Sequence, residues 1–119
     1  MNDVFLDKAH VLLANLYGNS NTTAAANHLQ VAAGIRAGIL DLMWDSSKLA
    51  FYDFNLTSNS RNSIFTAATF YPAWNDIIPD EVLASHANAL GYFSAVNMVM
   101  NKYNGTFPVT FVDWTGLQW

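Results

Sequence analysis

The chain has 119 residues, of which 52% are hydrophobic and only 12% charged, and its formal net charge is −4. An ordinary soluble domain has roughly 25% charged residues, and a small free-standing domain has a high surface-to-volume ratio and needs them most. The composition therefore favours a slice from the interior of a larger domain, and we expect residues 1–119 to form a single partial domain.

The same composition argues against several classes of function. The few basic residues are scattered singly, whereas a nucleic-acid surface needs clustered basic side chains to displace counterions. No apolar run approaches the ~18 to 20 residues that span a bilayer. Cysteine is absent, which excludes a disulfide framework and thiolate chemistry. We expect no nucleic-acid partner and no membrane segment.

Two helices are predicted in the first third of the chain, over 3–17 and over 22–44. The turn residues of 18–21 separate them, and Asn21 or Thr22 can cap the second helix. Apolar residues of the first helix share one face: Phe5, Leu6, Ala9, Leu12, Leu13 and Leu16. Because the connection is short, the two helices should form an antiparallel hairpin.

The middle of the chain changes character. Residues 45–48 have the composition of a turn, and the aromatic stretch that follows predicts a short β-hairpin near 49–56. Residues 57–62 are a polar loop. A short helix is expected over 63–74, so this region should connect helical segments through a small amount of strand.

The last third should be helical and then extended. Pro79, at a first-turn position and followed by two acidic residues, predicts the start of a long helix that runs to about Lys102. The pair Asn104–Gly105 predicts a turn into an extended C-terminal tail over 106–119. The whole chain is thus expected to be mainly α.

The histidines show no metal-binding pattern. His10, His28 and His86 each lie alone in a helical segment, without the spacing that a metal site requires. Each is better explained as an ordinary packed or surface residue. We expect no metal and no cofactor.

Two carboxyl groups can act as an acid and a base, as in a glycosidase, where they flank the scissile bond. The sequence pairs are Asp41 with Asp45 and Asp80 with Glu81. Both are better explained as solvated or capping groups. Asp113 lies in the Trp-rich tail, where a hydrogen-bonding role in a loop is favoured over catalysis.

Aromatic residues make up 14% of the chain and could stack on sugar rings. For clusters such as 51–54 and 70–74, packing in the core is favoured. Trp114 and Trp119 are the exceptions, because turn residues and Gln118 surround them.

The pattern Asn-x-Ser/Thr, which can accept an N-linked glycan, begins at Asn21, Asn55 and Asn104. All of these positions fall in predicted turns. They favour, weakly, a secreted parent protein.

Several segments resemble the trehalase family in the order that the family has them. They are 39–45 with 51–54, 63–74, 105–110, and Thr115 to Trp119. The last is the most specific, because it is similar to the start of the second trehalase signature, Gln-Trp-Asp-x-Pro-x-x-Trp. Met43 and Leu117 depart from the commoner Leu and Gln.

The resemblance implies an (α/α)6 toroid that hydrolyses α,α-trehalose to two glucose molecules with inversion. In that family the catalytic acid precedes the region matching Met1, and the base follows the region matching Trp119. We therefore assign no catalytic residue here and expect the chain to be inactive alone. Gln118 and Trp119 are the residues placed near the sugar, as a hydroxyl contact and a stacking wall.

The residues leave two alternative functions open. One is a segment of another (α/α)6 glycosidase, such as a glycan-processing glucosidase. The other is an independent helical interaction protein without catalysis. The trehalase resemblance favours a scaffold segment over both.

Overall fold

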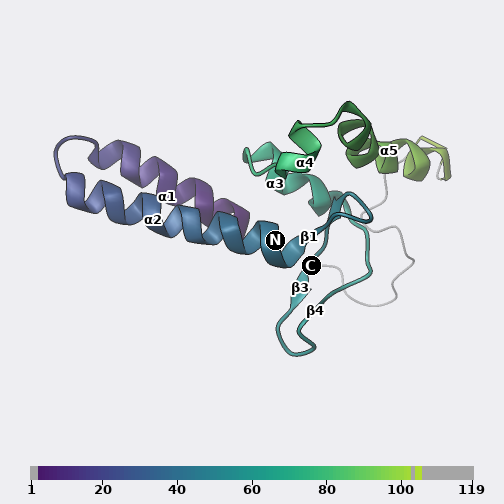
Figure 1. The fold of residues 1–119 in the computed structure, drawn as a ribbon, viewed down its shortest axis with the longest axis horizontal. Coiled ribbons are helices and arrows are strands. Elements are labelled where there is room, and N and C mark those ends of the chain that lie inside the picture. The colour runs from purple at the N-terminus through teal and green to yellow at the C-terminus, as the bar shows by residue number, and fades with distance from the viewer. Residues whose placement is uncertain (1–2, 103, 106–119) are drawn as a thin grey trace.

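A computed structural model describes residues 3–102 and 104–105 of the chain. The tail expected over 106–119, with Asp113, Gln118 and Trp119, lies outside the described residues. Figure 1 shows a long helical hairpin projecting from a group that contains the remaining helices and the strands.

The described chain is mainly helical, as the sequence predicts, with two small strand pairs. In chain order the elements are α1 (Asp3–Tyr17), α2 (Thr22–Gly38), the π-helix η1 (Ile39–Met43), β1 (Trp44–Asp45), β2 (Ala50–Phe51), β3 (Phe54–Asn55), β4 (Ser60–Arg61), the 3-10 helix η2 (Ala67–Phe70), α3 (Tyr71–Trp74), α4 (Asp80–Leu83) and α5 (His86–Lys102).

The expected antiparallel hairpin is α1 and α2 (Figure 1). Oδ1 of Asn21 accepts a hydrogen bond from the backbone N–H of Ala24 at 3.0 Å and so caps α2. This bond satisfies one of the orphan donors of the first turn. The predicted cap and helix starts are confirmed.

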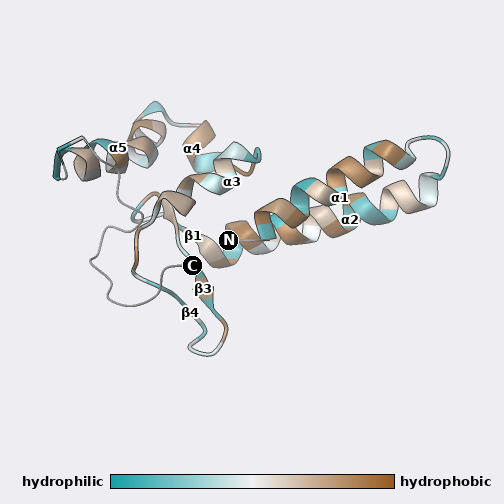
Figure 2. Ribbon diagram, turned by 180° about the vertical axis from the view of Figure 1, so that it is seen from behind, coloured by the Kyte–Doolittle hydropathy of each residue, from teal (hydrophilic) through white to brown (hydrophobic). Residues whose placement is uncertain are grey.

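The face of α1 that is buried is not the one with the most apolar residues. Val4, Asp7 and Ala14 are buried, and their spacing places them on one stripe. The expected apolar face lies opposite and is exposed: Phe5 by 56%, Leu6 by 52%, Leu12 by 59%, Leu13 by 38% and Leu16 by 80%. Figure 2 shows the hydrophobic character of this helix. The exposed face of α1 has one aromatic contact, in which the ring of Phe5 lies 5.9 Å from that of Tyr71, and its leucines remain largely exposed within the described residues.

The second helix reaches Met43, close to its predicted end, but not as a uniform α-helix. It changes to a π-helix over Ile39–Met43, a widening that is frequent at functional sites. Trp44 then turns to an extended conformation, with φ −76° and ψ 130°. This change of backbone ends the helix and starts β1.

The β-hairpin expected near 49–56 is two hairpins. In the first, Trp44 pairs with Phe51 and Asp45 with Ala50. In the second, β3 pairs with β4, Phe54 opposite Arg61. The predicted strand divides because its two halves belong to different ladders, each closed by its own turn.

The later helices start or break at hydroxyl side chains. The helix expected over 63–74 begins only at Ala67, where Oγ1 of Thr66 accepts the N–H of Ala68 at 3.1 Å. The long helix expected from Pro79 breaks between α4 and α5. There Oγ of Ser85 accepts the N–H of Asn88 at 3.3 Å and caps α5. Ser85 could have indicated this break, but the apolar spacing on both sides of it is compatible with one continuous helix.

The core lies where the hairpin meets the short elements. It contains Val4, Ile39, Trp44, Phe51, Ile77, Val82 and Tyr92. The core thus gathers residues from six elements and from the loop after α3. A close approach tightens it, because a Cβ added to Gly91 in α5 would lie 2.4 Å from Cδ1 of Leu49. That contact presses the first hairpin against α5.

Candidate functional site

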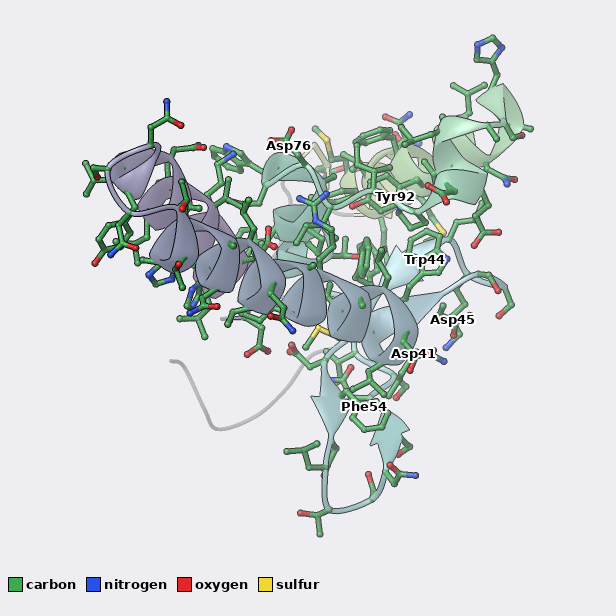
Figure 3. All side chains as sticks on the ribbon, turned by 60° about the vertical axis from the view of Figure 1, so that its left-hand side comes forward. Asp41, Trp44, Asp45, Phe54, Asp76 and Tyr92 are labelled. Atoms are coloured by element: carbon green, nitrogen blue, oxygen red, sulfur yellow. The ribbon has the colours of Figure 1, made fainter. Side chains whose placement is uncertain are left out.

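Among the described residues, two of the segments that resemble the trehalase pattern, 39–54 and 63–74, meet at Tyr92 of α5. The ring of Trp44 lies 5.9 Å from the ring of Tyr92 and 4.8 Å from that of Phe51. The ring of Phe70 lies 5.4 Å from that of Tyr92 at 68°. Figure 3 shows Trp44 and Tyr92 side by side. These tilted contacts are favourable aromatic geometries, and they confirm core packing for Phe51 and Phe70.

Thr69 supplies the polar contacts of this aromatic cluster. Its Oγ1 accepts the backbone N–H of Phe51 at 2.9 Å, and its carbonyl oxygen accepts the hydroxyl of Tyr92 at 2.9 Å. Thr69 is only 1% exposed, so both bonds satisfy groups that water does not reach. Burial raises the pKa of Tyr92 well above its ordinary value. Tyr92 is therefore a structural hydrogen-bond donor.

Trp44 also joins the hairpin to α4. Its Nε1 donates to Oε1 of Glu81. Glu81 is in the first turn of α4, where a carboxylate also favours the helix dipole. Its carboxylate thus fixes Trp44 and lies at the favourable end of the helix dipole, although no described side chain makes a capping hydrogen bond at the start of α4.

Asp45 closes the turn after β1. Its Oδ1 accepts the N–H of Ser47 at 3.0 Å and the hydroxyl of Ser47 at 2.6 Å. The Ser47 hydroxyl is the largest cause that lowers the pKa of Asp45, and Lys48 adds to it against the cost of burial. Its sequence partner, Asp41, is exposed. Structural roles for these carboxylates agree with the sequence interpretation.

A buried ion pair was not anticipated from the sequence. Asp7 of α1 is 1% exposed, and its Oδ2 lies 3.5 Å from Nη2 of Arg36 in α2. Oδ1 of Asp7 has no hydrogen-bond partner in the described chain. The sequence held a signal for this pair, because the helical spacing places Asp7 on the same side of α1 as Val4 and Ala14. Lys8 forms a further pair with Asp76 at 3.2 Å, which ties α1 to the loop after α3.

Two of the three histidines come together, although each was expected to be solitary. Nδ1 of His10 lies 2.8 Å from Nδ1 of His28, and the ring of Tyr17 stacks on His28 at 5.6 Å. One nitrogen must donate and the other accept. Over residues 3–102 and 104–105, no group of three or more potential ligands could hold a metal ion.

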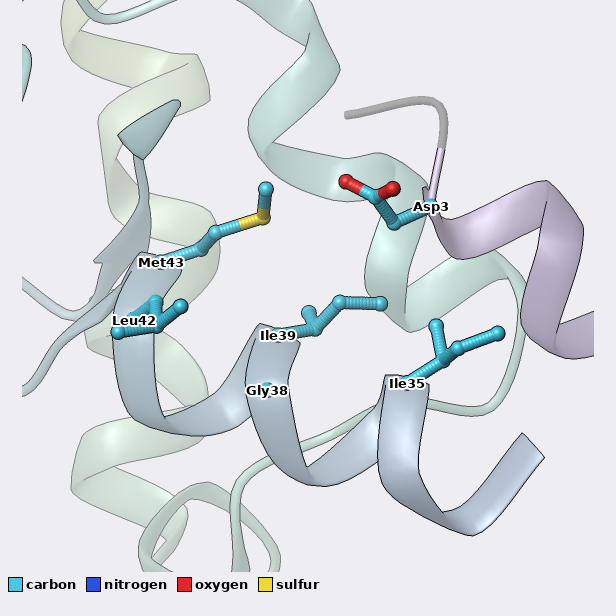
Figure 4. Close-up of a pocket in the computed structure, with 6 residues that line it drawn as sticks. All are labelled: Asp3, Ile35, Gly38, Ile39, Leu42 and Met43. Carbon is cyan, nitrogen blue, oxygen red and sulfur yellow. The ribbon is translucent and has the colours of Figure 1, made fainter. Parts of the chain in front are cut away.

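An apolar pocket lies where the end of α2 meets the start of α1 (Figure 4). Its volume is about 210 Å³, and it is lined by Asp3, Ile35, Gly38, Ile39, Leu42 and Met43. A sugar site needs several placed polar groups. The described lining offers one charged side chain, which is fewer polar groups than a sugar site needs.

The residues expected at the sugar are not among those described. Gln118 and Trp119 both lie in the range 106–119. The described elements that precede them hold aromatic residues and carboxylates in structural contacts. No helix of the described chain is long and apolar enough to cross a membrane. What the described residues provide is a framework.

The comparisons with known proteins agree with this picture. The model of the trehalase family matches residues 2–119, and the chain belongs to that family. It is 28% identical to the trehalase of Oryctolagus cuniculus over 98% of this chain and 20% of the relative. Identity to the trehalase of Homo sapiens is 25%, over 98% of this chain and 19% of the relative. The chain thus spans about a fifth of the length of these relatives.

Proposed function

We propose that this chain forms part of the helical scaffold of a trehalase catalytic domain. The complete enzyme would hydrolyse α,α-trehalose to two glucose molecules with inversion. By itself the chain would have no hydrolytic activity. The family match over residues 2–119 supports the assignment to trehalases.

The observation that carries the scaffold role is the double-sided character of α1. One stripe of α1 is buried against α2, and the opposite face exposes side chains such as Leu12 and Leu16, at 59% and 80%. An exposed row of large apolar side chains on a helix favours contact with other parts of a protein. In an (α/α)6 toroid, neighbouring helical hairpins would cover this exposed face.

The carboxylates support the same role. An inverting glycosidase needs an acid and a base about 6.5 to 9.5 Å apart, with room for water between them. Here Asp7 pairs with Arg36, Asp45 closes a turn, and Glu81 accepts from Trp44. Carboxylates committed to such contacts suit a framework, and the proposal places the acid and base elsewhere in the enzyme.

The proposal keeps Gln118 and Trp119 near the sugar. A tryptophan ring offers a flat apolar surface for stacking on a pyranose, and the glutamine amide can both donate to and accept from hydroxyl groups. In an enzyme that contains this segment, Trp119→Ala should raise KM for trehalose more than Trp119→Phe. Equal KM values for the two variants would remove Trp119 from the sugar site.

The decisive test is an assay of the purified chain for glucose release from trehalose. Rabbit trehalase under the same conditions serves as the positive control. We expect no release above the blank. Turnover that co-purifies with the chain would overturn the scaffold proposal.

The exposed apolar faces also suit a second candidate, a helical interaction protein without catalysis. Solution behaviour separates the two. A soluble monomer with one cooperative thermal transition would favour the independent protein. Self-association or a molten state would favour a scaffold segment that lacks its neighbours.

A further inference from the structure

We propose that Asn55 is the position of this chain that accepts an N-linked glycan. Three asparagines begin the acceptor pattern, at Asn21, Asn55 and Asn104. The sequence does not rank them. The geometry points to Asn55, and within the proposed enzyme the inference also requires that the hairpin of β3 and β4 stays open to solvent.

The side chain of Asn55 already forms the local turn that presents such a site. Its Oδ1 accepts the backbone N–H of Thr57 at 2.8 Å and that of Ser58 at 3.1 Å. This is an Asx-turn. Asn55 and Thr57, the two residues that define the pattern, are thereby brought together. The contacts use Oδ1 and not Nδ2, the atom that carries a glycan.

The surroundings of Asn55 are open. Residues 55–61 are all exposed, and Leu56 at the turn is 84% exposed. Figure 1 shows the hairpin of β3 and β4 projecting from the rest of the molecule. Nη2 of Arg61 donates to the carbonyl oxygen of Asp41 at 3.1 Å and holds the base of this hairpin in place. A glycan on Asn55 would therefore extend into solvent without displacing packed side chains.

Asn21 presents a different geometry. Its Oδ1 accepts the N–H of Ala24 at 3.0 Å, three residues on, because it caps α2. Thr23, which completes the pattern, is already in the first turn of α2. Presenting Asn21 in an Asx-turn would require that turn of helix to unwind and the cap to be lost, at about 1 kcal/mol for the cap.

Asn104 is also poorly presented. It has φ 52° and is followed by Gly105 with φ 83°. The N–H of Gly105 donates to the carbonyl oxygen of Met100 at 2.7 Å and so closes the end of α5. This pair of left-handed residues ends a helix, whereas the turn at Asn55 is formed by the acceptor side chain itself.

The reaction takes its sugar from an oligosaccharide linked through diphosphate to a lipid. A bond forms between Nδ2 of Asn55 and C1 of the first sugar. The bond between C1 and the diphosphate oxygen breaks, and the lipid diphosphate leaves with the electron pair. Nδ2 loses one proton. No oxidation or reduction occurs.

The test expresses the full chain behind a secretion signal in a eukaryotic cell that N-glycosylates proteins. Enzymatic removal of an N-glycan converts the carrier Asn to Asp, so peptide masses report each position separately. We expect the mark at Asn55, and loss of the gel shift in Asn55→Gln. The matched variants Asn21→Gln and Asn104→Gln should keep the shift.

Further variants leave Asn55 in place. Thr57→Ala removes the hydroxyl of the pattern and should abolish the glycan, whereas Thr57→Ser should retain it. Peptides are read from cell lysate as well as medium, so a variant that folds poorly is still measured. An unmodified Asn55 in the wild-type chain, or a glycan retained by Asn55→Gln, overturns the proposal.

Discussion

The indole of Trp44 donates a hydrogen bond to the carboxylate of Glu81, 37 residues later in the chain. The bond joins the end of the helical hairpin to the first turn of α4. Trp44 is 7% exposed, so its Nε1 depends on a protein acceptor more than a surface group would.

The Trp44–Glu81 contact gives the first prediction. Glu81→Ala should lower the free energy of unfolding by about 1 kcal/mol, because a buried donor loses its acceptor. Glu81→Gln retains a side-chain carbonyl and should cost much less. Urea unfolding followed by circular dichroism measures both. Asp80→Ala, in the same turn, is the control, and an equal effect there would attribute the loss to the helix end instead.

The buried ion pair gives the second prediction. Arg36→Met leaves Asp7 as a buried charge without a partner. The expected cost is about 2 kcal/mol, below the ~3–5 kcal/mol of a fully buried pair, because the Arg36 side chain is 42% exposed.

The double variant Asp7→Val with Arg36→Met should recover most of that stability, since it removes both charges. The readout is the urea midpoint of both single variants and the double variant. Additive losses in the double variant would show that Asp7 and Arg36 are not coupled.

The third prediction concerns alkaline pH. Burial raises the pKa of Tyr92, while an unfolded tyrosine ionises near pH ~10. Below that pH both states keep the proton, and the stabilisation is fully present. Above it only the unfolded chain ionises, so stability falls by up to ~1.4 kcal/mol per pH unit until the folded group titrates.

Tyr92→Phe should therefore cost about 1 kcal/mol at neutral pH, through the lost bond to Thr69, and should flatten the alkaline decline. A residual slope is expected from Tyr52, whose pKa burial also raises. Unfolding midpoints between pH 8 and roughly pH 11 measure the effect. An unchanged slope in Tyr92→Phe would assign the decline to other groups.

The fourth prediction concerns the exposed face of α1. Leu13→Lys with Leu16→Lys should reduce self-association of the purified chain, because the variant charges the patch without touching the stripe buried against α2. Sedimentation velocity measures the change. Leu56→Lys charges an isolated side chain that is 84% exposed and should have little effect; an equal reduction there would show that net charge alone is responsible.

Some features followed from local pattern and were confirmed. The first helix has its predicted bounds, and the turn at Asp45 forms because that residue accepts from its own near neighbours. The family was also evident, since the match covers residues 2–119. The contacts of Gln118 and Trp119 with a sugar stay predictions.

Two elements differ in detail from the sequence expectation, one for a local reason and the other because of strand pairing. The helix expected from Pro79 breaks at Ser85, since a hydroxyl that caps the next helix competes with the helical pattern. The strand expected near 49–56 divides into β2 and β3, because strand pairing depends on the partner and its register.

By itself the sequence determined where α1 starts and ends and to which family the chain belongs. Helical period, caps and the order of the signature segments are all encoded within short stretches. Only the tertiary structure decided which side of α1 is buried and that His10 meets His28. Those outcomes depend on how two helices face each other. Residues 18 positions apart carry no local record of that orientation, so it is fixed only when the helices pack.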